Sequence, residues 1–148
     1  MKTYKVEVQA NGDTEWYLND LRHREDGPAI EYADGTKLWY INGTLHREDG
    51  PAAEYTLGTK LWYIDGKRHR EDGPACEFFD GTKEWHLNGK RHREDGPALV
   101  YPNGGKIWYL NGDKLTEDQF NEKMNPTVEL TIAEIEKLLG FKNLKITK

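Results

Sequence analysis

A short charged motif repeats along this 148-residue chain and carries residue types that could bind a metal ion or transfer a proton. Imidazole and carboxylate groups are common zinc ligands and common general acids and bases. Within one copy, His46, Glu48 and Asp49 could offer ligands to a single ion. The motif HREDGPA begins at four histidines that lie 23 residues apart: His23, His46, His69 and His92.

The spacing between the copies argues against such chemistry. Equivalent residues of neighbouring hairpins in a sheet lie roughly 10 Å apart, whereas two imidazoles on one metal ion need nitrogen atoms about 3 Å apart. An active site is usually one asymmetric cluster, so four copies of one loop indicate a structural element. We therefore predict no enzyme activity, no catalytic residue, no metal site and no cofactor.

In this structural interpretation, Asp49 caps its own turn, and Arg47 pairs with Glu48 along an exposed edge, where such a pair contributes little stability. The Asp-Gly-Pro segments restart the next strand, because proline is tolerated at a strand start. The residues predicted to form these structural turns are Asp49, Gly50, Pro51, Asp72, Gly73 and Pro74.

The elements that position the motif follow the same 23-residue period. Each unit contains two turn signals, exemplified by Asp34-Gly35 and Asn42-Gly43. Asp-Gly is favoured in two-residue hairpin loops, whose central residues both need positive φ. We predict a mainly β protein, with an elongated antiparallel sheet of five tandem β-hairpins over residues 1–114, the first copy being partial. Every tryptophan belongs to this period: Trp16, Trp39, Trp62, Trp85 and Trp108.

A two-residue loop at Asp34-Gly35 pairs Ile30 with Trp39 and sorts the side chains onto two faces. Ile30 and Trp39 then share the buried face, so the five tryptophans form the core of the repeat. Cys76 occupies the Ile30 position of its unit and is expected to be a buried apolar residue. The opposite face carries an aromatic ladder that we predict to be a binding surface, and its members are Tyr17, Tyr40, Tyr63, His86 and Tyr109.

Three departures from the pattern single out the third to fifth units. Leu57 replaces the aspartate of the turn, the first strand of the fourth unit is the aromatic Cys76-Glu77-Phe78-Phe79, and Glu84 with His86 alters its second strand.

These units resemble MORN-type repeats, which are arrays of hairpins with a 23-residue period. The resemblance covers residues 1–114 and rests on Tyr32-Ala33-Asp34-Gly35 and on Asn88-Gly89-Lys90-Arg91-His92. The HREDGPA strand entry departs from the usual MORN unit, and it is similar to uncharacterised proteins of tailed bacteriophages. The resemblance implies a scaffold or binding surface rather than catalysis.

Residues 115–148 do not repeat, and we predict that they form a cap of alternating helices and strands. Thr116 and Thr131 are suitable helix N-caps, and the latter begins a capping box. Gly140 is a typical helix stop. The predicted elements are a helix over Thr116–Met124, a strand over Val128–Leu130, a helix over Ile132–Leu139 and a strand over Leu144–Thr147.

Composition limits the partners and the compartment. The formal net charge of −5 disfavours a nucleic-acid-binding surface, which is usually basic. The single cysteine excludes an intrachain disulfide. No segment has the apolar length of a membrane span or of a signal peptide. We expect a cytoplasmic protein, in the host cytoplasm if it is phage-encoded, without a membrane partner.

The sequence therefore predicts a non-enzymatic protein-binding module. It would be phage-encoded and act on a host protein, for example by inhibiting a host defence system. A homo-oligomer formed through the Trp face would cover that face. Two alternatives remain open. The aromatic ladder could hold a nucleotide-like small molecule, as a sponge or sensor, or the regularly spaced carboxylates could mimic a nucleic acid.

Overall fold

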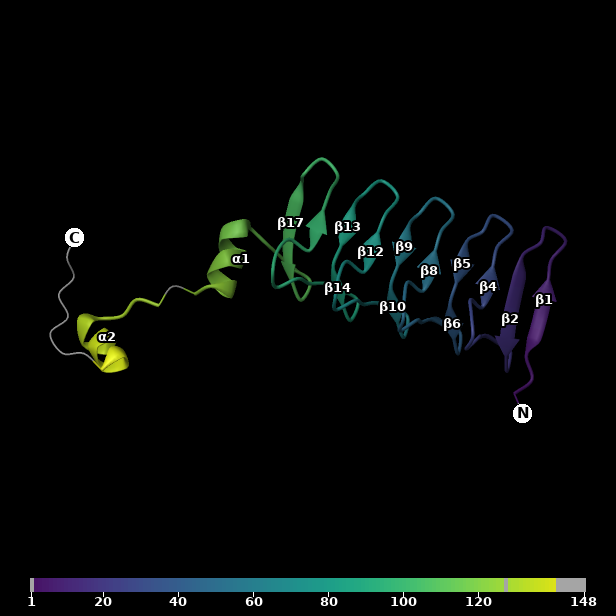
Figure 1. Cartoon of the computed structure of the whole chain (residues 1–148), viewed down its shortest axis with the longest axis horizontal. Helices are drawn as coiled ribbons and strands as arrows, with labels where there is room; N and C mark the ends of the chain where they lie inside the picture. The colour runs from purple at the N-terminus through teal and green to yellow at the C-terminus, as the bar shows by residue number, and fades with distance from the viewer. Residues whose placement is uncertain (1, 127, 141–148) are drawn as a thin grey trace.

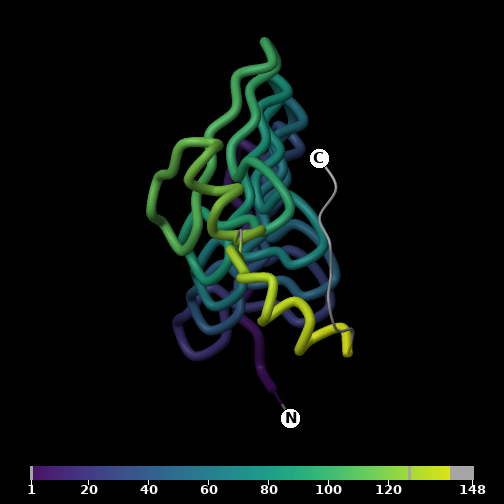
Figure 2. The backbone as a smooth tube through the Cα atoms, turned by 90° about the vertical axis from the view of Figure 1, so that its left-hand side faces the viewer, coloured from purple at the N-terminus to yellow at the C-terminus, as the bar shows by residue number. Residues whose placement is uncertain are grey.

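The computed structural model describes residues 2–126 and 128–140. The chain forms a long antiparallel sheet of tandem β-hairpins, with two short helices near its C-terminal end (Figure 1). A view along the long axis shows the hairpins stacked one behind another (Figure 2). The predicted fold class is therefore confirmed.

Each unit contributes one hairpin to a 12-stranded sheet and forms a second, shorter hairpin beside it. In the second unit the sheet hairpin is β4 (Ile30–Glu31) with β5 (Lys37–Leu38), and the short hairpin is β6 (Tyr40–Ile41) with β7 (Thr44–Leu45). The next two units repeat this arrangement as β8 (Ala53–Glu54), β9 (Lys60–Leu61), β10 (Tyr63–Ile64), β11 (Lys67–Arg68), β12 (Cys76–Glu77), β13 (Lys83–Glu84), β14 (His86–Leu87) and β15 (Lys90–Arg91).

Each end of the array also contains longer strands, namely β1 and β2 at one end and β17 and β18 at the other. The sheet runs in the order β1-β2-β4-β5-β8-β9-β12-β13-β16-β17-β18, and β3 pairs with β2. The strands at the ends are β1 (Lys5–Val8), β2 (Thr14–Leu18), β3 (Leu21–Arg22), β16 (Leu99–Val100), β17 (Lys106–Leu110) and β18 (Asp113–Leu115).

Each of the first four tryptophans marks the point where a strand changes its pairing partner. Before Trp39, Leu38 pairs with Ala53 of the next unit. Trp39 itself donates its backbone N–H to the carbonyl of Ala52 at 2.8 Å, and its carbonyl accepts the N–H of His46 at 3.1 Å. The two hairpins of a unit therefore share one strand, which connects the long sheet to the row of short hairpins.

The two-residue turn of the unit lies at Asn42-Gly43, and not at Asp34-Gly35 as predicted. Asn42 and Gly43 have φ values of 49° and 80°, so they form the two-residue turn in which both residues need positive φ. At the other turn, Gly35 has a φ of 90°, and Tyr32 donates its backbone N–H to the carbonyl of Thr36 at 2.9 Å. That loop has three residues rather than two.

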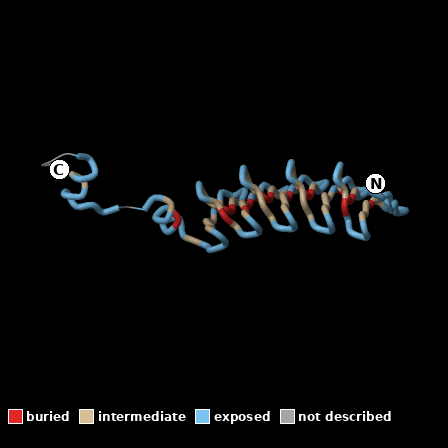
Figure 3. The backbone as a smooth tube through the Cα atoms, turned by 90° about the horizontal axis from the view of Figure 1, so that it is seen from below, coloured by how far each residue is buried: buried red, intermediate tan, exposed pale blue. Residues whose placement is uncertain are grey.

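This difference of one residue changes the pairing and the faces. Ile30 pairs with Leu38, so the predicted pairing of Ile30 with Trp39 is wrong. The tryptophans are half-buried, so the prediction that they form the buried core of the repeat is also wrong. The core is instead a row of small and aliphatic residues along the middle of the array (Figure 3), namely Ala29, Ile30, Ala52, Ala53, Ala75, Cys76, Ala98 and Leu99.

Two helices follow the array, and both were predicted. α1 (Glu117–Met124) begins after a capping box between Thr116 and Gln119 and lies against β17 and β18, where Phe120 is buried. It closes the C-terminal end of the sheet. Neither helix among the described residues is long and apolar enough to span a bilayer.

The second helix does not act as a cap. α2 (Ile132–Leu139) begins after a capping box between Thr131 and Glu134, ends at left-handed Gly140 and buries none of its residues. It lies beyond α1, away from the sheet (Figure 1). Val128–Leu130, which was predicted to be a strand, pairs with no strand among the described residues. The predicted strand over Leu144–Thr147 lies outside the described residues.

Candidate functional site

The arginine of each HREDGPA loop lies between two strands. The Arg47 guanidinium carbon is 4.1 Å from the centre of the Trp39 ring. Its Nε donates to Asp49 at 2.8 Å, and its Nη1 donates to Glu54 at 3.0 Å and to the Pro51 carbonyl at 3.3 Å. The equivalent arginines also stack on tryptophan and bond to the following aspartate and proline carbonyl: Arg24, Arg70 and Arg93.

The glycine of the loop leaves room for this arginine. A Cβ atom added to Gly50 would lie 2.9 Å from the Arg47 guanidinium carbon, which is closer than carbon atoms approach without contact strain. The hydrogen bond from Arg47 lowers the pKa of Asp49. The predicted pairing of Arg47 with Glu48 is wrong, because Arg47 bonds to Asp49 and Glu54 instead.

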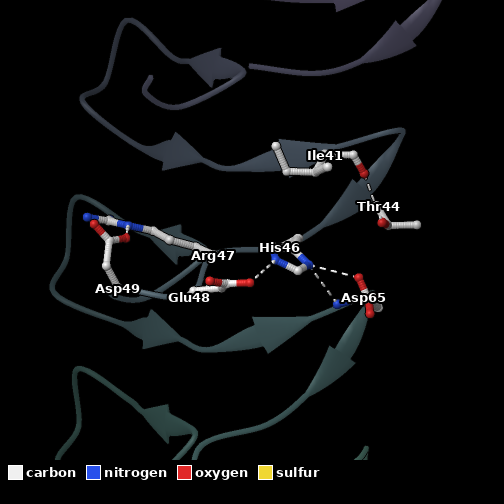
Figure 4. Close-up of polar contacts among 7 residues, drawn as sticks. All are labelled: Ile41, Thr44, His46, Arg47, Glu48, Asp49 and Asp65. Atoms are coloured by element: carbon white, nitrogen blue, oxygen red, sulfur yellow. Dashed lines mark hydrogen bonds and ion pairs between the residues drawn. The ribbon is translucent and has the colours of Figure 1, made fainter. Parts of the chain in front are cut away.

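The histidine of each loop joins its unit to the next one (Figure 4). Nδ1 of His46 accepts the backbone N–H of Asp65 at 3.2 Å, and its Nε2 lies 3.7 Å from the Glu48 carboxylate. Asp65 opens the short turn of the following unit. The same N–H to Nδ1 bond, at 3.0 to 3.1 Å, connects His23 with Asn42, His69 with Asn88 and His92 with Asn111.

These contacts give the HREDGPA loop a structural role. Its arginine connects the strands on either side, and its histidine holds the next turn. They support the interpretation of the predicted turn residues as structural: Asp49, Gly50, Pro51, Asp72, Gly73 and Pro74. The arginines also stack on the rings of four tryptophans, namely Trp16, Trp39, Trp62 and Trp85, and so cover part of the Trp face.

The residues of the aromatic ladder recur at equivalent positions on successive strands, but they already have partners. Tyr63 packs against the buried core, and its hydroxyl accepts a hydrogen bond from Arg68 at 3.3 Å. Tyr17 donates to Glu15 at 2.7 Å. Arginine side chains also lie near the rings of two further members, Tyr40 and Tyr109. The four tyrosines are half-buried and His86 is buried.

A buried charged cluster surrounds His86 in the fourth unit. Glu84 lies 2.8 Å from His86 Nε2 and accepts a hydrogen bond from Arg91 at 2.9 Å, with Arg68 3.6 Å away. Burial disfavours the Glu84 carboxylate, but hydrogen bonds from Arg91 and His86 outweigh this and lower its pKa. Burial lowers the pKa of His86 more than its bond to Glu84 raises it. Burial also raises the pKa of the Cys76 thiol to about 11.

This cluster contains the donor types of a zinc site. Among the described residues, one potential ligand atom each from Cys76, Glu84 and His86 lies within 4.8 Å of the other two. The electrostatics oppose a cation, because the guanidinium groups of Arg91 and Arg68 already neutralise the Glu84 carboxylate. In the first unit, Glu15 forms the same network with Tyr17 and Arg22, without a thiol or an imidazole. Charge pairing is therefore sufficient to explain the arrangement.

Two neighbouring hairpin tips expose large apolar side chains. The relative accessibilities of Leu57, Phe79 and Tyr55 are 77%, 70% and 43%. We call these three residues the tip patch. Leu57 takes the place of Asp34 and Asp80 in the adjacent units, and the backbone N–H of Phe79 donates to Thr59 Oγ1 at 3.1 Å, which links the two tips. A shallow depression beside the patch is also lined by Thr36, Leu61 and Phe78.

Leu57 and Phe78-Phe79 are recognisable in the sequence as departures from the repeat, but their proximity in space was not predicted. They are 22 residues apart, and only the stacking of adjacent hairpins makes them neighbours. The exposure of Phe79 also depends on the three-residue loop at this tip, which was predicted to have two residues.

No protein-family model matches the chain, and no curated protein matches it.

Proposed function

We propose that this chain is a non-enzymatic protein-binding module and that the tip patch contacts its partner. The observation that carries this proposal is the exposure of Leu57 and Phe79, at 77% and 70%, on adjacent hairpin tips. Exposed apolar side chains that gather in one place are typical of protein interaction sites. Leucine and phenylalanine at these positions have no counterpart in the neighbouring units, so the architecture of the repeat does not require them.

The rest of the unit favours such a role because it holds the tips in place. The bond between Phe79 and Thr59 joins the two tips, and the histidine bonds join each unit to the next. A surface that is ordered before binding loses little conformational entropy when a partner docks. The tip patch therefore has the properties of a preorganised contact site.

A finer proposal concerns the origin of the chain. The MORN-like period and the HREDGPA strand entry, which is similar to phage proteins, favour a phage-encoded protein in the host cytoplasm. Its partner would then be a bacterial protein, for example a component of a host defence system. The acidic net charge of −5 fits a protein partner better than a nucleic acid.

Affinity capture from bacterial lysate, followed by titration calorimetry with the purified captured protein, tests the proposal. The decisive variant combines Leu57→Asp with Phe79→Ala, which restores the residue types of Asp34 and Ala33 in the second unit. We expect the wild-type chain to bind one partner stoichiometrically and the double variant to lose that binding. The matched control is Leu138→Asp, which replaces an equally exposed leucine on α2 and should leave binding unchanged.

Two outcomes contradict the proposal. Equal binding by the wild type and the double variant would exclude the tip patch. If binding were instead lost when Tyr40, Tyr63 and Tyr109 are replaced by phenylalanine, the ladder would be the contact surface.

A further inference from the structure

At the N-terminal end of the sheet, β1 (Lys5–Val8) pairs on one side only among the described residues. β1 pairs with β2 on one side, and all four of its residues are exposed, including Val6 at 48% and Val8 at 72%. β1 is the outermost strand of the array (Figure 1). At the opposite end, β18 and α1 lie against β17. Unpaired edges readily accept another strand.

The hydrogen bonds around β1 show which backbone groups point outward. Gln9 donates its N–H to the carbonyl of Asp13, while Trp16 donates its N–H away from β1, to Ala29. Hydrogen-bonded and non-hydrogen-bonded pairs alternate along an antiparallel ladder. Lys5 and Glu7 therefore bond to β2, and the N–H and C=O groups of Val6 and Val8 face away from the sheet.

We propose that β1 pairs in antiparallel fashion with β1 of a second copy of this chain, centred on Val6. In this register Val6 lies opposite Val6 of the second copy, and Tyr4 lies opposite Val8. Within the part of the chain that the structure describes, the backbone groups of Val6 and Val8 face away from the sheet and can form the new hydrogen bonds. The two sheets then continue into one another across a twofold axis, so the same patch serves both copies.

The side chains of β1 favour this register. With Val6 at the centre, Lys5 of each copy lies opposite Glu7 of the other in a non-hydrogen-bonded pair, where side chains approach most closely. Opposite charges across strands stabilise a ladder, and like charges destabilise it. Shifting the centre to Glu7 would place two glutamates directly opposite one another. Val6, Val8 and Tyr4 meet on the other face, so both faces of the strand are complementary to themselves.

A contact confined to one strand buries less area than a standard protein interface. We therefore expect a dimer that forms as the protein concentration rises, rather than a permanent one. Sedimentation velocity of the full chain between micromolar and millimolar concentration should show a transition from monomer to dimer. A chain that remains monomeric throughout this range would overturn the proposal.

The variant Val6→Pro tests the role of the backbone. The N–H of Val6 does not bond to β2, and proline is tolerated on an outer strand edge, so the variant should fold like the wild type. We expect it to stay monomeric where the wild type dimerises. Unchanged dimerisation of a folded Val6→Pro variant would show that the copies meet elsewhere.

Charge exchange tests the register independently. Lys5→Glu and Glu7→Lys each place like charges opposite one another in a dimer of identical chains, so each variant alone should be monomeric. An equimolar mixture should form a heterodimer, because an acidic strand then faces a basic one. Failure of the mixture to associate would contradict the proposed register. This test is independent of the tip patch, so it can succeed or fail without affecting the proposed function.

Discussion

The two ends of each sheet hairpin differ in how much their residues vary from unit to unit. At one end the HREDGPA loop keeps the same residues in every full unit, and its arginine and histidine are engaged with neighbouring strands and turns. At the other end the tips vary, with Asp34, Leu57, Asp80 and Asn103 at equivalent positions. The repeated residues therefore hold the array together, whereas the exposed tip residues that vary between units are available to contact a partner.

Removing a loop arginine should have the largest effect on stability. Arg70→Ala removes the stacking on Trp62 and the bonds to Asp72 and Glu77. We expect the free energy of unfolding to fall by about 2 kcal/mol, given typical values for a partly desolvated cation–π contact and for charged hydrogen bonds. Chemical denaturation measures this change. Glu71→Ala, in the same loop but exposed, is the control and should change little. Equal stability of the Arg70 and Glu71 variants would contradict a structural role for the arginine.

Removing a loop histidine should have a smaller and more local effect. His69→Ala leaves the backbone N–H of Asn88 without its acceptor. A single hydrogen bond of this kind contributes about 1 kcal/mol. We expect faster hydrogen exchange at the Asn88 amide, while the Asn42 amide, held by His23, keeps its protection as an internal control. Unchanged exchange at Asn88 would mean that the histidine does not join the units.

His86 should make stability depend on pH. Burial lowers its folded-state pKa below the ordinary value of 6.5, so the unfolded chain takes up a proton first as the pH falls. Stability should therefore decrease as the pH falls below about 6.5, until the folded-state pKa is reached. His86→Tyr restores the residue found at this ladder position in the other units and should remove that dependence. Thermal unfolding from pH 7.5 to pH 5.5 compares the two chains, and parallel curves would contradict the role assigned to His86.

Replacing a tip residue should have the smallest effect on folding. Leu57 is exposed, and Leu57→Asp restores the common turn residue, so the free energy of unfolding should change by no more than about 0.5 kcal/mol. Denaturation under the conditions used for Arg70→Ala measures this. A loss as large as that of the arginine variant would show that Leu57 is a structural residue, and the contrast between loop and tip would not hold.

The sequence predicts the parts of this structure that depend on local chemistry. The period, the hairpins and both helix caps follow from glycine turns and from threonine N-caps. The register does not, because Asp34-Gly35 and Asn42-Gly43 are similar turn signals. Only the packed structure shows that the second is the two-residue turn. That one-residue difference moved the tryptophans off the buried face.

The candidate site was harder to predict for a related reason. Leu57 and Phe79 stand out as departures from the pattern, but their proximity and exposure arise from the stacking of units. The contacts of the loop residues also cross between units, as the His46 bond to Asp65 does. A pattern within one unit cannot specify such contacts.

The affinity of the purified partner for the Leu57→Asp/Phe79→Ala variant, measured by titration calorimetry against the wild type, tests the central claim most directly. If the tip patch is the binding site, the affinity should fall at least about tenfold, which corresponds to about 1.4 kcal/mol. An affinity equal to that of the wild type would contradict the claim.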